Sequence, residues 1–234
     1  MPATLAQSRT TSPGSGTTFS LAFSGAVSAG STIGFCIRVG TSASGFTAGD
    51  SVNGANTWTC EAPFNNLAGD TLACGWFQNT GAGTPNVTVN WTGSASIRAI
   101  IWEAAGVVTA GGRDQFSIAD PGSGSPTTTP STPTANTTST NEIILAMVEA
   151  SNAGFSYTEN ASGSNPSSGW AQVADVDTGK LHLSYVVVSA TGAYKEVWST
   201  SSDFFSAGIL SFAAAPSGFF SRYYYDMNTT RLNV

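Results

Sequence analysis

The chain has 234 residues with 41% hydrophobic residues, only 9% charged residues and a net charge of −6. This length is enough for one large all-β domain or two small ones, and the hydrophobic fraction excludes a disordered protein. The acidic balance and the eight scattered Lys and Arg argue against nucleic-acid binding. The longest apolar runs have the length of strands, so we expect no membrane span.

Short runs of alternating or β-branched residues recur between turn clusters, at a spacing typical of a β-sandwich. No segment has sustained helical periodicity with capping residues, so little helix is expected. In the first half we predict strands at residues 3–9, 17–23, 32–39, 57–61, 71–78, 86–91 and 97–103. In the second half we predict them at 115–118, 142–149, 169–174, 181–188, 194–199 and 207–213.

The sequence is similar to itself at an offset of roughly 110 residues, which indicates a duplicated unit. STIGFCIRVG (31–40) aligns with NEIILAMVEA (141–150), and Trp58 aligns with Trp170. We therefore predict an all-β fold: an antiparallel, jelly-roll-like β-sandwich over residues 1–216, built from two similar halves, 1–107 and 108–216. The alternative is two tandem immunoglobulin-like domains. The Pro- and Thr-rich stretch 117–140 is either a tether or an extended connection along one domain, and the repeat favours the second.

Few side chains suggest chemistry. The single histidine, His182, is expected on a surface or in a groove, and no Ser-His-acid, metalloprotease or phosphate-loop motif surrounds it. Glu142 and Glu149 lie seven residues apart on one strand and should face opposite sides of the sheet, which argues against a glycosidase pair. We predict no enzymatic activity and no cofactor.

Two further features are weaker. Asp175 and Asp177 in DVDTG could offer oxygen ligands to calcium, although a β-turn uses the same residues. The three cysteines are an odd number without metal-type spacing. Buried free thiols are the favoured interpretation, with a disulfide between Cys60 and Cys74 as the alternative.

Some aromatic residues are candidates for a glycan-binding surface. Trp58 and Trp170 recur at equivalent positions, which favours a packing role, and Trp76 and Trp102 lie in apolar runs that indicate core. The residues expected to be partly exposed, and therefore available for glycan contacts, are Trp91, Trp198 and Tyr157.

The last 18 residues, SGFFSRYYYDMNTTRLNV (217–234), fall outside both repeats. So many aromatic rings are costly to leave in water. The tail adds a strand to the sandwich, docks on a neighbouring subunit or a larger assembly, or is disordered. The docking hypothesis assigns assembly contacts to Phe219, Phe220, Tyr223, Tyr224 and Tyr225.

GANTWT (54–59), IIWEAAGV (100–107), NEIILAMV (141–148) and ILSFAAA (209–215) together resemble duplicated jelly-roll or concanavalin-like β-sandwich modules. Such modules occur in phage virion proteins and in bacterial surface proteins. The resemblance covers residues 1–215 and implies a fold rather than catalytic residues. The aromatic tail departs from the usual ending of these modules.

The first functional hypothesis is a non-enzymatic virion structural protein of a tailed phage, either a capsid-decorating protein or a fibre or spike subunit. Its partners would be other virion proteins or copies of itself in a homo-oligomer such as a trimer, without nucleic acid or membrane. The N-terminus lacks the basic start and apolar core of a secretory signal, so we expect a chain used without export, or one whose signal was removed. The alternatives are a carbohydrate-binding adhesin module that contacts a host-surface glycan and an extracellular filament subunit, at the cell surface or outside the cell.

Overall fold

The computed structural model describes residues 3–216, which form fourteen strands and no helix. No helix in this range could therefore cross a membrane. The first half contains β1 (Thr4–Ala22), β2 (Thr32–Val39), β3 (Ser44–Asp50), β4 (Thr59–Cys60), β5 (Phe64–Asn65), β6 (Thr71–Phe77) and β7 (Asn86–Ala105). The second half contains β8 (Arg113–Ala119), β9 (Ala135–Asn136), β10 (Glu142–Ala150), β11 (Ala171–Val176), β12 (Leu181–Val188), β13 (Ala193–Tyr194) and β14 (Phe205–Ala213).

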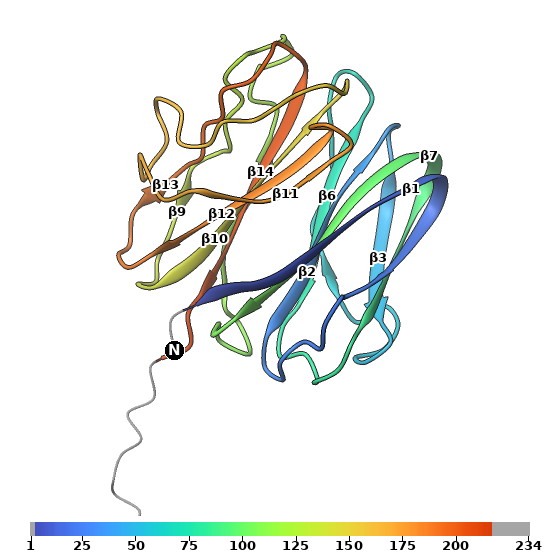
Figure 1. Ribbon diagram of the computed structural model, residues 1–234, viewed down its shortest axis with the longest axis vertical. Coiled ribbons are helices and arrows are strands. Elements are labelled where there is room, and N and C mark those ends of the chain that lie inside the picture. The colour runs from blue at the N-terminus through green and yellow to red at the C-terminus, as the bar shows by residue number, and fades with distance from the viewer. Residues whose placement is uncertain (1–2, 217–234) are drawn as a thin grey trace, which may run out of the picture.

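Each half contributes one large antiparallel sheet, and the two sheets pack face to face (Figure 1). The first sheet has the order β1-β7-β2-β6-β4, with β3 beside β7 and β5 beside β6, and the second has the order β8-β14-β10-β12-β11. In the first half, the first strand β1 pairs with the last strand β7, and β7 pairs with β2, which begins at Thr32. In the second half, β8 pairs with the last strand β14, and β14 pairs with β10, which begins 110 residues later at Glu142. The prediction of an all-β antiparallel sandwich is confirmed.

Two strands are longer than predicted. β1 and β7 each join two predicted strands and pair with each other along their whole length. The strands bend without ending, because Gly14 and Gly93 adopt positive φ angles of 88° and 92° that glycine tolerates. Beyond the bend β7 exchanges its neighbour β2 for β3, so that β3 and the distal parts of β1 and β7 form an outer layer.

Three apolar clusters fill the spaces between the layers. The first core, between the inner and outer layers of the first half, includes Phe35, Trp58 and Trp91. The shared core lies between the two sheets and takes Cys36, Trp76 and Trp102 from the first half. The second half contributes Ile143, Leu145, Met147, Leu183, Leu210 and Phe212 to it. The second core, which includes Trp170, Trp198 and Phe205, lies on the outer side of the second sheet.

The outer layer of the second half is mostly irregular. Its chain segments are joined by isolated bridges such as Thr127 to Asp203 and Ser131 to Val197, and by the short pair β9–β13. Pro126, Pro130 and Pro133 interrupt it, because proline has no N–H group to donate. The stretch 117–140 therefore runs along the second half as an extended connection.

The two sheets meet with a twofold-like relationship. β1 at one edge of the first sheet contacts β11 at the far edge of the second, and β7 contacts β12 while β14 contacts β6. At the other edge, Nε of Arg113 on β8 lies 3.5 Å from Oε1 of Glu61, which follows β4. Each sheet thus covers the other along its full width.

Candidate functional site

The described chain begins and ends at one pole of the molecule (Figure 1). Thr4 pairs with Ala105, Ala214 N donates to Asn141 O, and Ala215 N donates to Gly106 O. The loops at this end, which we call the terminal pole, contain no Asp, Glu, Lys or Arg; they are residues 24–31, 78–85, 106–112, 138–141, 189–192 and 214–216. The proposed assembly contacts Phe219, Phe220, Tyr223, Tyr224 and Tyr225 lie outside the described residues, which end at Pro216.

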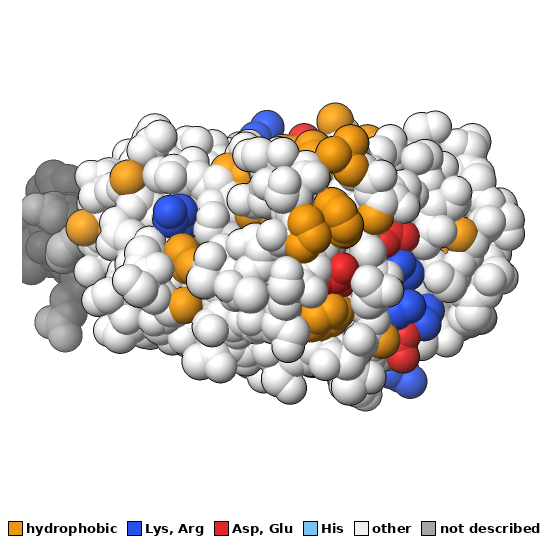
Figure 2. All heavy atoms as spheres, turned by 90° about the horizontal axis from the view of Figure 1, so that it is seen from above, with side chains coloured by type: hydrophobic (Ala, Val, Ile, Leu, Met, Phe, Trp, Pro, Cys, Tyr) orange, Lys and Arg blue, Asp and Glu red, His pale blue; other side chains and the backbone are white. Residues whose placement is uncertain are grey.

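The opposite pole carries more charge. Figure 2 looks onto it: most of the visible surface is uncharged, and most of its charged side chains gather on one side. Arg98 Nε donates to Asp177 Oδ2 over 2.6 Å, so that β7 is joined to the turn between β11 and β12. This ion pair fastens the first half to the second.

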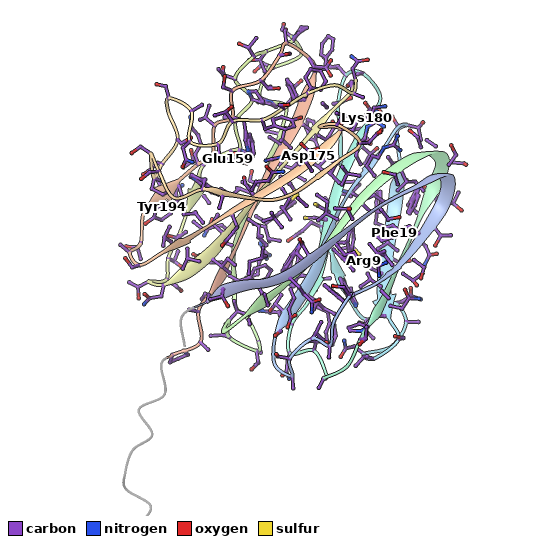
Figure 3. All side chains as sticks on the ribbon, in the orientation of Figure 1. Arg9, Phe19, Glu159, Asp175, Lys180 and Tyr194 are labelled. Carbon is purple, nitrogen blue, oxygen red and sulfur yellow. The ribbon has the colours of Figure 1, made fainter. Side chains whose placement is uncertain are left out.

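A titratable cluster surrounds His182 on β12. The expectation of a surface histidine is wrong, since His182 is 1% exposed. Its Nε2 lies 3.0 Å from Glu159 Oε1, and its Nδ1 lies 3.7 Å from Asp175 Oδ2. Figure 3 shows these two carboxylates in the same region of the second half. The centroid of the His182 ring lies 4.6 Å from the centroid of the Tyr157 ring, because the loop that carries Tyr157 covers this face of the sheet.

The electrostatics of this cluster follow from burial and the two carboxylates. Burial lowers the pKa of His182, but Asp175 and Glu159 outweigh it, so the net pKa is raised above its ordinary value. Burial raises the pKa of Glu159, but the His182 bond outweighs it and the net pKa is lowered. Burial raises the pKa of the neighbouring Glu196 to about 7. The cluster is built to hold an imidazolium between carboxylates.

The calcium candidate is not supported by the geometry of the turn. Asp175 accepts a hydrogen bond from Gly179 N over 2.7 Å and faces His182, whereas Asp177 pairs with Arg98. The two carboxylates thus have separate protein partners and do not converge on one point. Residues 3–216 contain no group of three or more His, Cys, Asp or Glu side chains arranged to hold a metal ion.

The proposed glycan contacts are buried, which overturns the expectation of an exposed aromatic surface. Trp91 is 5% exposed and its Nε1 donates to Gly93 O. Trp198 is fully buried, and Tyr157 is 9% exposed with its hydroxyl donating to Gly179 O. All three face the first or second core, which the outer layers cover. Trp58, Trp76, Trp102 and Trp170 are buried as predicted.

A second polar cluster lies between the sheets and was not foreseen. Arg38 Nη2 donates to Asp70 Oδ1 over 2.8 Å, and Arg38 Nε lies 3.7 Å from Glu149 Oε2 of the second half. Glu149 Oε1 accepts hydrogen bonds from Asn66 of the first half and from Ser206. Burial raises the pKa of Glu149 to about 8. These bonds give the contact between the halves a defined register.

The remaining buried acids serve the local fold. Glu103 accepts hydrogen bonds from Gln7, Ser28 and Ser31, which hold the 24–31 loop. Glu142 accepts a bond from Ser139 N, and burial followed by the neighbouring Asp114 raises its pKa to about 7. Glu142 and Glu149 are both fully buried, at opposite ends of β10.

The three cysteines are free. Cys36 lies opposite Cys74 across β2 and β6, and both face the shared core. Cys60 instead packs against the first core, on the other face of the same sheet. The alternative pairing of Cys60 with Cys74 would therefore have to cross the sheet.

No protein-family model matches the sequence, and the comparisons with curated proteins and with solved structures found no match either.

Proposed function

We propose that this chain is a non-enzymatic structural protein of a tailed-phage virion, a capsid-decorating protein or a fibre or spike subunit. It attaches through residues 217–234 to other virion proteins or to copies of itself. The uncharged terminal pole, from which the aromatic tail continues, carries this proposal.

Charge-free loops favour an assembly role for the terminal pole. The centres of protein interfaces are depleted of charged residues, because burying an ion without a partner is costly. Glu103 and Asp114, which lie on strands near this pole, are engaged in internal hydrogen bonds. The loops can therefore lie against another protein without desolvating an ion.

The composition of the tail fits a docking segment. It combines five aromatic residues with Arg222 and Arg231, the residue types that are enriched among the energetically dominant contacts of interfaces. It begins beyond Pro216, which is exposed at the terminal pole. A tail that leaves from this pole brings the uncharged loops toward the surface it binds.

A rigid body suits a structural subunit. The shared core and the Arg38–Glu149 and Arg98–Asp177 contacts hold the halves together, so force applied at one pole is transmitted to the other. The buried acids form internal hydrogen bonds, which gives them a structural role in the proposed protein.

The test separates the tail from the rest of the chain. Immunogold labelling of the source material should place the chain on tailed particles. In sedimentation velocity, the full chain should form oligomers, and a variant with Phe219, Phe220, Tyr223, Tyr224 and Tyr225 replaced by Ser should remain a monomer and fail to join particles. The control changes Asn228, Thr229 and Thr230 to Ala and should assemble normally. Normal incorporation of the five-serine variant would overturn the proposal.

A further inference from the structure

His182 joins the second sheet to the loop that covers it. We call residues 151–169 the covering segment; it crosses the second core and carries Phe155, Tyr157 and Glu159. His182 belongs to β12 and Asp175 to β11, so the imidazole links the sheet to Glu159 of the segment. It is the only histidine of the chain.

The covering segment has other attachments, and some are to charged side chains: Ser151 O accepts from Arg38, Asn152 donates to Asp203, and Asn160 N donates to Glu196. Gly154 N and Phe155 N both donate to Thr178 O, and the Tyr157 hydroxyl donates to Gly179 O. Further along, Thr158 pairs with Ser199. Within the described residues, the contact of Glu159 with His182 is the ion pair between an acidic side chain of the segment and the sheet.

We propose that protonated His182 is a pH-sensitive clasp, which holds the covering segment closed while the imidazole is charged and loosens it when the proton is lost as pH rises. The groups that face the imidazole are Glu159 from the segment, Asp175 from β11, Glu196 from the chain beyond β13, and the Tyr157 ring. Loss of the imidazolium leaves these carboxylates close together without a compensating cation.

The direction of the switch follows from the shifts. The raised pKa of His182 means that the folded state binds this proton more tightly than the unfolded state does. The resulting contribution to stability is present below the ordinary pKa of about 6.5 and is lost as pH rises through the folded-state pKa. Glu196, with a pKa of about 7, gains its negative charge as pH rises through that value. The lowered pKa of Glu159 keeps that carboxylate charged on the acid side. The clasp is therefore closed at pH values below the folded-state pKa of His182 and loosens above it.

Opening would expose a defined aromatic surface. Tyr157 packs against Trp198 and Phe205, and Phe155 packs edge-on to Phe205. Trp198 and Phe205 lie beneath the covering segment, and the burial of these rings against Phe155 and Tyr157 opposes its release. We therefore expect the segment to loosen locally while the sheet stays folded.

The first test uses the single histidine. Its NMR signal needs no assignment against other histidines, and a titration of the full chain should give a pKa above about 6.5. Hydrogen exchange, corrected for the intrinsic rate at each pH, should show that protection of residues 151–169 falls about tenfold from pH 6 to pH 9, while β10 and β14 stay protected.

Variants make the test decisive. Glu159→Gln removes the charge but keeps an acceptor, so protection of 151–169 at pH 6 should drop to the pH 9 level and its pH dependence should vanish. Glu61→Gln, a carboxylate paired with Arg113 elsewhere, is the matched control and should keep the wild-type profile. The proposal is overturned by a His182 pKa at or below about 6.5, or by a Glu159→Gln profile equal to that of the wild type. Neither result requires a His182 variant.

Discussion

Arg38 of the first half and Glu149 of the second half face each other between the sheets, with Arg38 Nε 3.7 Å from Glu149 Oε2. Arg38 is also bound to Asp70, and Glu149 to Asn66, so side chains of both halves belong to one buried network. Apolar packing alone tolerates sliding between two sheets, whereas a hydrogen-bonded polar group must meet a particular partner. This network therefore specifies how the halves align.

Replacing Arg38 should strongly destabilise the fold. Arg38→Met leaves the buried Asp70 carboxylate without its cation, and breaking a buried pair typically costs about 3–5 kcal/mol. Arg98→Met is the matched control, since Arg98 also joins the halves but its partner Asp177 is partly exposed, and about 1 kcal/mol or less is expected. Urea denaturation measures both. Equal losses for the two variants would contradict this account of the network.

Stability should decline from pH 5 to pH 8. Burial raises the folded-state pKa values of Glu142 and Glu149 to about 7 and about 8. The contribution of the protonated carboxyl groups to folding stability is therefore present below the ordinary pKa of about 4.5 and is lost as pH rises through the folded-state pKa values. Thermal unfolding should therefore show a lower Tm at pH 8 than at pH 5. Glu149→Gln cannot ionise and should flatten this decline; an unchanged slope in that variant would remove Glu149 as its cause.

Gly34 on β2 should not tolerate a side chain. A Cβ at this position would lie 2.1 Å from Cζ2 of the fully buried Trp102, which has no room to move. Gly34→Ala should cost about 1–3 kcal/mol or more from overpacking. Gly16→Ala is the control because its Cβ would meet only ordinary contacts of 3.5 Å and beyond. Guanidinium denaturation of both variants gives the comparison, and similar stabilities would refute the packing argument.

The three thiols should differ in reactivity. Burial raises the pKa values of Cys36 and Cys74 and shields both, while Cys60 is partly exposed with a pKa raised to about 11 by burial. At pH 8 an aromatic disulfide reagent should label Cys60 slowly and spare the other two, because the thiolate is the reactive form. In guanidinium all three should react. Rapid labelling of Cys74 in the folded protein would be inconsistent with the shared core.

Much of the fold could be predicted because strand periodicity is local. The alternation in NVTVNWT identifies the buried face of β7, with Val87, Val89 and Trp91 in the first core. β3 was missed because SGFTAGD has two glycines and no apolar alternation, and it is held by pairing with β7. The division of β1 and β7 into two strands each was wrong because glycine permits a bend as well as a break.

The surroundings of individual side chains were harder to predict. Alternation shows that His182 and Trp198 share a face with particular neighbours, but not that an irregular loop covers that face. The Arg38–Glu149 network joins residues more than a hundred positions apart, and its only sequence signal is a charged residue within an otherwise apolar strand. Such interruptions are the signal that could have located it.

The position of the chain ends also decides where foreign sequence can be added. A peptide fused to the N-terminus would join the chain at the terminal pole, where Thr4 pairs with Ala105. The turn between β5 and β6 lies at the opposite pole, where Leu67 is 76% exposed. An epitope inserted between Leu67 and Ala68 would be displayed at the pole opposite the one where the described chain begins and ends, which makes this turn a site for using the protein as a display scaffold.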